Sequence, residues 1–138
     1  MTKHIQPQPV PKSHRDLIER PVVAALGTTL SNDTPQVTPV WFNTDADGYF
    51  YFNTAKGRVK EKALAKKPYV ALLIVDPTNP YRYLAVRGPI VEASPAEGRA
   101  HINALSQKYT GNPTYKSSTP DEQRIRYKVA PQFVSVMG

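Results

Sequence analysis

Short extended segments separated by tight turns constrain the fold of this chain more than any other feature. Residues 22–30 are apolar and uncharged, and the turn sequence SND follows them. A second extended segment at 35–42 contains Pro39, and a hairpin turn at 45–48 leads into a third segment at 49–53. Such segments, bounded by Gly, Pro, Asn and Asp, are typical of β-strands. They predict an antiparallel β-meander.

The rest of the chain mixes strands with a few helices. The run at 69–76 is apolar at nearly every position and predicts a strand covered on both faces. A strand at 81–93, with a break at Gly88-Pro89, follows it, and residues 132–137 predict the last strand. Helices are expected between Ser13 and Pro21 and at 58–67.

Two further helices are predicted from capping boxes. The first box, Ser94-Pro95-Ala96-Glu97, has proline at the first helical position and opens a helix with Ile102, Leu105 and Tyr109 on one face. The second, Thr119-Pro120-Asp121-Glu122, predicts a helix before the last strand.

From residue 22 onward the order is β-β-β-α-β-β-α-α-β, which predicts a mainly β fold, a small antiparallel barrel with peripheral helices. The 138 residues fit a single domain over 1–138, with residues 1–12 as an extended N-terminal arm. The first 21 residues lack the apolar stretch of a signal peptide. No window approaches the roughly 18 apolar residues that a membrane-spanning helix needs. We therefore expect a cytoplasmic protein that has no membrane partner.

The charge balance favours an anionic partner. The formal net charge is +7 and the pI is about 9.7, which suits a phosphate-bearing cofactor, a nucleic acid or a membrane surface. No aromatic RNA-binding motif and no DNA-recognition helix is evident, so no nucleic-acid partner is expected. The chain has no cysteine, which excludes disulfides and thiolate metal sites.

No constellation of catalytic side chains is recognisable. The sequences GxGxxG and GxSxG and the P-loop are absent, and the three histidines have no metal-ligand spacing. Asp45, Asp47 and Asp76 fall in predicted turns, where such residues serve the turn itself. No catalytic residue and no metal site is therefore assigned. The reactive atoms of an enzyme of this kind would belong to a cofactor.

Cations are crowded at the start of the helix predicted at 58–67. Asn53 and Thr54 end a strand, and Arg58 and Lys60 stand at the helix start, where the helix dipole disfavours positive charge. Free amides, a hydroxyl and two cations at this point can converge on one phosphate. The alternative is a solvated basic helix face on which Glu61 pairs locally.

Two more segments have features of a binding site. Pro39 cannot donate to a strand ladder, so its strand is expected to be an edge or a bulge, with backbone groups left for a planar heterocycle. A plain edge strand is the alternative. Tyr81 and Arg82 suit stacking on a ring or contact with an acidic tail, or they belong to an ordinary surface strand. Trp41 is expected in the core or an interface.

Several of these segments resemble one known family. The sequences PQVTPVWF, FYFNTAKGRVKEKAL, VALLIVDPTNPYRYLAVRG and YTG are similar to the split-barrel flavin and deazaflavin oxidoreductases of the pyridoxamine-phosphate-oxidase-like superfamily. The similarity covers residues 17–137. TPVWF, GRVK and NPYRYLAVRG most resemble the branch that uses coenzyme F420, a phosphate-bearing 8-hydroxy-5-deazaflavin with a polyglutamate tail.

The resemblance implies a six-stranded antiparallel split β-barrel of the FMN-binding type and a homodimer with cofactor sites at the interface. It also implies which residues bind the cofactor. The residues facing its ring system are Val37, Thr38, Pro39 and Val40. Those holding its phosphate are Asn53, Thr54, Arg58 and Lys60. Further contacts, including those with the acidic tail, are expected from Lys56, Tyr81 and Arg82.

The activity that the resemblance implies is an F420-dependent oxidoreductase that transfers a hydride between the cofactor and a small organic acceptor. Both F420 and FMN carry a phosphate, so GRVK does not separate them. An FMN-dependent oxidase or reductase of the same fold therefore remains an alternative. A protein that binds the cofactor without catalysis is another.

Overall fold

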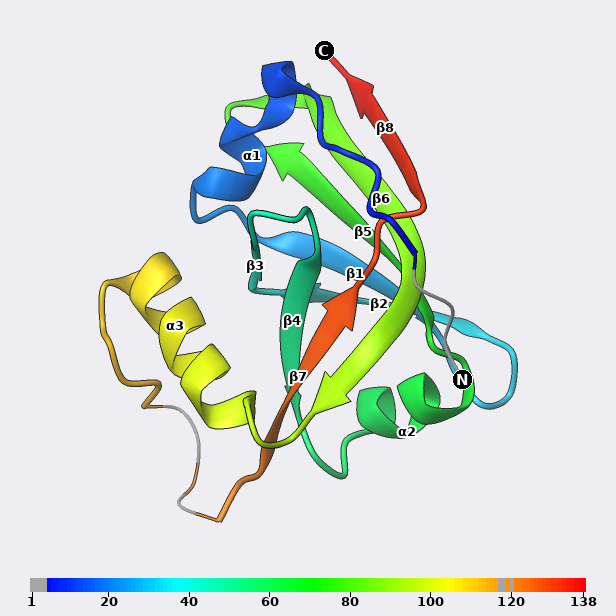
Figure 1. Ribbon diagram of the computed structural model, residues 1–138, viewed down its shortest axis with the longest axis vertical. Coiled ribbons are helices and arrows are strands. Elements are labelled where there is room, and N and C mark those ends of the chain that lie inside the picture. Colours follow the sequence, from blue (N-terminus) through cyan, green and yellow to red (C-terminus); the bar gives the residue numbers. More distant parts are fainter. Residues whose placement is uncertain (1–4, 117–118, 120) are drawn as a thin grey trace.

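Two antiparallel sheets that share one long strand form the body of the molecule (Figure 1). The computed structural model describes residues 5–116, 119 and 121–138. Within them the elements are η1 (Lys12–His14), α1 (Asp16–Glu19), β1 (Ala24–Thr29), β2 (Pro35–Val40), β3 (Phe42–Thr44), β4 (Phe50–Ala55), α2 (Val59–Lys66), β5 (Tyr69–Asp76), β6 (Asn79–Ser94), α3 (Gly98–Thr110), β7 (Arg124–Val129) and β8 (Phe133–Met137).

The shared strand is β6. The strands follow the order β2-β1-β5-β6-β7-β4-β3, and β8 also pairs with β6. β6 pairs with β5 as far as Pro89 and with β7 from Ile90 onward. The sequence predicts a break at Gly88-Pro89, but the strand is continuous there and changes its partner instead. An added Cβ on Gly88 would lie 1.9 Å from the Ala130 carbonyl oxygen, so only glycine allows the chain to cross at this point.

The core lies between the inner faces of the two sheets. Its large members come from both, and none of the following is more than 1% exposed: Leu26, Leu72, Ile74, Phe50 and Phe52. Burial of each such side chain stabilises the fold by roughly 1.5–3 kcal/mol. The mainly β split barrel that the sequence predicts is confirmed.

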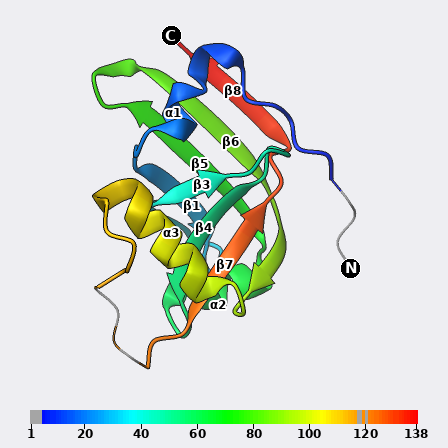
Figure 2. The same ribbon diagram turned by 60° about the vertical axis from the view of Figure 1, so that its left-hand side comes forward.

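The helices pack around this barrel (Figures 1 and 2). α3 lies beside β4 and β7, and two of its side chains donate hydrogen bonds to backbone carbonyl groups of other segments. The Tyr109 hydroxyl donates to the Val22 carbonyl at 2.7 Å, and Lys108 Nζ donates to the Phe42 carbonyl at 2.9 Å. Burial lowers the pKa of Lys108 to about 8. No helix in the described part of the chain is long and apolar enough to cross a membrane.

The strand β7 replaces a helix that the sequence predicts. The second capping box, of which Pro120 lies outside the described residues, precedes a strand and not a helix. The reason is the alternation in Arg124–Val129, which turns Ile125, Tyr127 and Val129 into the core, while β4 and β6 satisfy the backbone on the two edges. With β7, and with β3 as a separate strand after Trp41, the described residues form eight strands instead of six.

The first sheet consists of β2, β1, β5, the first part of β6 and β8, and the second of the rest of β6, β7, β4 and β3. One face of the first sheet is apolar and uncovered in the single chain. β5 alternates between exposed and buried residues along most of its length, so only one of its two apolar faces is covered. We define the outer apolar face by four residues with large exposed fractions: Val23 (48%), Val37 (69%), Leu73 (39%) and Phe133 (49%). Exposed apolar patches of this kind mark interaction surfaces.

Candidate functional site

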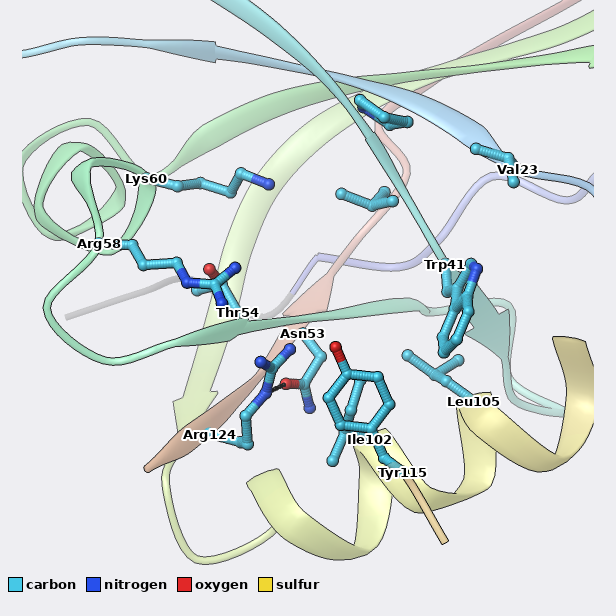
Figure 3. A pocket seen from close by; sticks show the side chains of 12 residues that line it. Val23, Trp41, Asn53, Thr54, Arg58, Lys60, Ile102, Leu105, Tyr115 and Arg124 are labelled. Carbon is cyan, nitrogen blue, oxygen red and sulfur yellow. Dashed lines mark hydrogen bonds between the residues drawn. The ribbon is translucent and has the colours of Figure 1, made fainter. Parts of the chain in front are cut away.

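A cavity of about 280 Å³ lies between the two sheets, α2 and α3 (Figure 3). One part of its wall is apolar and is formed by Val23, Pro39, Val40, Trp41, Ile102 and Leu105. The other part is polar and is formed by Asn53, Thr54, Arg58, Lys60, Tyr115 and Arg124. A concave site with an apolar wall and a few convergent polar groups is the usual form of a cofactor site.

The start of α2 supplies two of the polar groups. Gly57 has a positive φ of 91°, and Arg58 is the N-cap residue, so the chain turns sharply from β4 into the helix. The Glu61 carboxylate accepts a hydrogen bond from the Gly57 amide at 3.0 Å, which ties this turn to the first turn of the helix. The side chains of Arg58 and Lys60 extend from this turn into the cavity (Figure 3). The amides of the first helical turn have no partner within the helix.

A third cation enters from the opposite side. Arg124, the first residue of β7, is 6% exposed and points into the cavity beside Asn53 (Figure 3). Its Nε donates to Asn53 Oδ1 at 2.8 Å, and its Nη1 donates to the Glu122 carboxylate. Arg124 is not among the site residues that the sequence predicts, because the second capping box predicts a helix in this region. The alternation R-I-R-Y-K-V was the signal that could have shown the strand.

The three cations, Arg58, Lys60 and Arg124, repel one another. The pKa of Lys60 is lowered, first by burial and then by the charges of Arg58 and Arg124. Glu122 is a nearby counterion, with its carboxylate 4.0 Å from Arg58 and also bound to Arg124. One carboxylate beside three cations leaves a surplus of positive charge in a partly buried site. Such an arrangement is suited to a doubly charged anion.

Asn53 and Thr54 both line the cavity, but they serve it differently. The Asn53 amide is committed within the protein, since its Nδ2 donates to the Gly98 carbonyl at 3.0 Å and its Oδ1 accepts from Arg124. Thr54 is 2% exposed and lies between Asn53 and the cations of α2. The structure thus makes Asn53 a support for the cavity wall.

A histidine lies directly behind this wall. His101 Nδ1 is 3.0 Å from Asn53 Nδ2, and its Nε2 is 2.9 Å from Asn43 Oδ1. Burial, followed by the charges of Arg126 and Arg124, lowers the pKa of His101 to about 4. The ring is therefore neutral at physiological pH.

The sequence-predicted site residues separate into two groups. The structure brings together Pro39, Val40, Asn53, Thr54, Arg58 and Lys60 at the cavity. It places the others elsewhere in the single chain, and these are Val37, Thr38, Lys56, Tyr81 and Arg82. Trp41, expected in the core or an interface, lines the cavity and stacks on Tyr109 with ring centroids 5.2 Å apart.

Each residue of the second group has a definite position. Val37 and Thr38 line a hollow of about 290 Å³ that adjoins the outer apolar face. Lys56 is exposed, and so is Tyr81, at 78%. Arg82 binds Asp16 and Asp76 at 2.6 and 2.9 Å, which joins α1 to the barrel. In this chain Arg82 therefore has a structural role.

Comparisons with known proteins agree on one fold. The profile of the pyridoxamine 5'-phosphate oxidase family matches residues 10–137. A solved structure of an F420 reductase is similar, with 32% sequence identity and a TM-score of 0.80, over 91% of this chain and 98% of that chain. A search of curated proteins found no match.

Two more distant structures are similar in fold alone. A conserved hypothetical protein from Mycobacterium tuberculosis has 14% identity and a TM-score of 0.71, over 99% of this chain and 89% of the other. General stress protein 26 from Bacillus anthracis has 16% identity and a TM-score of 0.63, over 89% of each chain.

The depressed pKa of His101 predicts a specific loss of stability in acid. Between its folded pKa of about 4 and the ordinary value of 6.5, the unfolded state binds more protons, so stability decreases as the pH falls through this range. From pH 7 to pH 5 the loss from this group is about 2 kcal/mol. Urea unfolding of the wild type and of His101→Asn at both pH values measures it. The variant should lose less stability by that amount, and equal losses would contradict the assignment.

Proposed function

We propose a function from one premise: the chain belongs to the pyridoxamine 5'-phosphate oxidase family, whose profile matches nearly its whole length. The proposed function is that of a flavin- or deazaflavin-type oxidoreductase that uses coenzyme F420. It transfers a hydride between this cofactor and a small organic acceptor. The observation that carries the proposal is the convergence of Arg58, Lys60 and Arg124 beside an apolar wall in one cavity.

The cation group fits the phosphate that both flavin mononucleotide and F420 carry. Arg58 and Lys60 extend from the start of α2, where a helix dipole also favours an anion. Arg124 is held from the other side by Asn53. A phosphate among these side chains would relieve the mutual repulsion that adds to the effect of burial in lowering the pKa of Lys60. Its charge-assisted hydrogen bonds are each worth roughly 1.5–3 kcal/mol.

The apolar wall fits a planar ring system. Pro39 and Val40 belong to β2, which is the edge strand of its sheet and pairs on one side with β1. An edge strand has backbone groups without ladder partners, and these are suited to the carbonyl and N–H edges of a heterocycle. Trp41 adds an aromatic surface to the same wall.

The chain's own contribution to the reaction is to bind and orient. The chemistry that a bound reduced deazaflavin would supply is the hydride itself. Lys60 and the two arginines would hold the phosphate end, and the β2 segment would fix the ring against the apolar wall. The wall also excludes water from that side of the ring, which protects a hydride donor from side reactions.

The choice of F420 over FMN depends on the similarity to an F420 reductase at 32% identity. The excess of basic residues also favours a cofactor with an acidic tail. The cavity cations alone do not distinguish the two, because both cofactors carry a phosphate.

Fluorescence titration of the purified protein with F420 and with FMN tests the cofactor. We expect tighter binding of F420, by roughly an order of magnitude, from the additional anionic groups of its tail. Equal or tighter binding of FMN would move the proposal to an FMN-dependent enzyme of the same fold. F420 binding without oxidation of the reduced cofactor by any of a panel of activated alkenes and imines would favour a non-catalytic binding protein.

Substitutions at the start of α2 test the phosphate site. Arg58→Ala and Lys60→Ala should each weaken cofactor binding by about one to two decades, which is the loss of one charge-assisted hydrogen bond. Unfolding free energies should change by no more than about 0.5 kcal/mol, since neither cation benefits the helix start. Lys66→Ala, at the exposed last turn of the same helix, is the matched control. Three unchanged affinities would place the phosphate elsewhere.

The outer apolar face supports a homodimer. A second copy seated there would cover the apolar face of β5 that the single chain leaves exposed. Val23 and Pro39 line both the cavity and the hollow that adjoins this face, so a partner would border the cofactor site. Val37 and Thr38 lie on the same hollow, which agrees with their expected place near a cofactor shared between subunits.

Light scattering should give twice the chain mass of 15.4 kDa at micromolar concentration. Leu73→Glu should reduce this to the mass of one chain, because it places a charge on the outer apolar face that a second copy would bury. Val59→Glu is the control, since Val59 is 60% exposed but lies on α2, outside that face. A monomeric wild type would contradict the dimer.

A further inference from the structure

A chain of hydrogen bonds connects His101 to the cavity through two residues. His101 Nδ1 lies 3.0 Å from Asn53 Nδ2, and Asn53 Oδ1 lies 2.8 Å from Arg124 Nε. At its far end, His101 Nε2 lies 2.9 Å from Asn43 Oδ1. The members come from α3, β4, β7 and β3, so the chain of bonds ties four elements together behind the cavity wall.

The direction of every bond follows from groups that can act in one way only. Arg124 Nε can only donate, so the oxygen of the Asn53 amide must face it. The Gly98 carbonyl can only accept, so the nitrogen of the same amide must face that carbonyl. With this orientation fixed, Asn53 Nδ2 donates to His101 Nδ1. His101 must then carry its proton on Nε2 and donate it to Asn43.

We propose that His101 is a positioning residue for the anion site, which acts by fixing the Asn53 amide so that this amide holds the Arg124 guanidinium in the cavity. The part of this proposal in which Arg124 contacts a phosphate rests on the proposed function. The part in which His101 and Asn53 hold Arg124 in place rests on the geometry alone. Asn53, expected from the sequence to bind the cofactor, is then also a positioning residue.

The other contacts of Arg124 leave this role to the Asn53 amide. Glu122 binds the Nη1 end of the guanidinium, and the Tyr115 ring lies 5.3 Å from its centre. Glu122 belongs to the segment just before β7 and Tyr115 to the loop after α3, so neither lies in a strand of the barrel. Asn53 lies inside β4 and binds Nε, which is the guanidinium nitrogen nearest the backbone of Arg124. It therefore fixes the direction in which the guanidinium extends from β7.

The surroundings of His101 keep it in the form that the role requires. The charged groups that affect it are Arg124 and Arg126 of β7, and both disfavour a protonated ring. Tyr51 of β4 lies beside it, with ring centroids 6.1 Å apart. A protonated ring would have no acceptor for Asn53 Nδ2. The neutral ring accepts at one nitrogen and donates at the other.

Two substitutions of similar size test the two ring nitrogens of His101 separately. In His101→Asn the amide oxygen can take the place of Nδ1 and accept from Asn53. In His101→Gln the amide nitrogen can take the place of Nε2 and donate to Asn43, but the acceptor for Asn53 is lost. His14→Gln is the matched control, because His14 is a buried histidine that binds the Met137 carbonyl through Nε2, away from the cavity.

Affinity for paired ligands gives the first readout. The ligands are F420 and its counterpart that lacks the phosphate and tail, or FMN and riboflavin if FMN is the cofactor. We expect His101→Gln to bind the phosphate-bearing ligand roughly tenfold more weakly. Binding of the phosphate-free ligand should stay within about twofold, since the ring wall is untouched. His101→Asn and His14→Gln should resemble the wild type. Equal loss for both ligands, or no loss in a folded His101→Gln, would overturn the proposal.

Nitrogen-15 NMR of the ligand-free protein gives a second readout that needs no cofactor. In the wild type, His101 should carry its proton on Nε2, and Arg124 Nε–H should give a slowly exchanging signal, identified by its absence in Arg124→Lys. This signal should broaden or exchange faster in His101→Gln and persist in His101→Asn. A proton on Nδ1 of the wild type, or an unchanged signal in folded His101→Gln, would refute the positioning role even if the cofactor binds.

The two readouts also separate the inference from the proposed function. If the Arg124 signal depends on His101 while neither cofactor binds the wild type, the positioning role holds and the proposed function fails. If both cofactors bind but the signal ignores His101, the proposed function holds and the positioning role fails.

Discussion

The sixteen-residue strand β6 is the element on which the rest of the structure depends. It belongs to both sheets, and its change of partner after Pro89 sets how the sheets lie against each other. The link between β7 and β8 crosses β6 at this point, where the Ala130 amide donates to the Pro89 carbonyl at 3.0 Å. Without a Cβ at Gly88 the crossing chain can come this close.

The cavity is a consequence of this arrangement. Its apolar wall includes residues of β2, in the first sheet, and its polar wall includes residues of β4 and β7, in the second. α2 then brings Arg58 and Lys60 to the space between the walls. A ring system and a phosphate need surfaces of opposite character a short distance apart. Two sheets joined through one strand provide such surfaces without a second domain.

The sequence predicts the parts of this structure that local patterns determine. Turns and alternation identify most strands, and the glycine and cations at 57–60 identify the start of α2. The prediction failed at β7, where the local signal of a capping box conflicts with the alternation that follows it, and pairing with two neighbouring strands decided the outcome. Arg124 was missed for the same reason.

Other site features depend on partners far away along the chain. Arg82 pairs with Asp16, 66 positions earlier, and no local pattern distinguishes an arginine committed to that ion pair from one that is available to a cofactor. In the sequence, Asn53 likewise resembles a phosphate ligand, because it stands next to a threonine just before the cations at 56–60, although it lies inside β4. Its commitment to Gly98 and Arg124 is visible only once α3 and β7 are placed beside β4.

The chemistry of the groups behind Arg124 follows from the need to keep its charge. A carboxylate in place of Asn53 would bind the guanidinium more strongly, but it would also neutralise the charge that a phosphate requires. An amide holds the same nitrogen with a neutral oxygen and leaves the charge available. The amide must itself be oriented, and the Gly98 carbonyl and a histidine with a pKa of about 4 do so without adding charge of either sign. Glu122 does carry a charge and binds Arg124, but at Nη1, and it lies outside the barrel strands. Neutral groups within the barrel and at its wall therefore orient the Arg124 guanidinium, and the cavity keeps more positive than negative charge. That surplus disfavours the empty site, and an anion bound there would offset it.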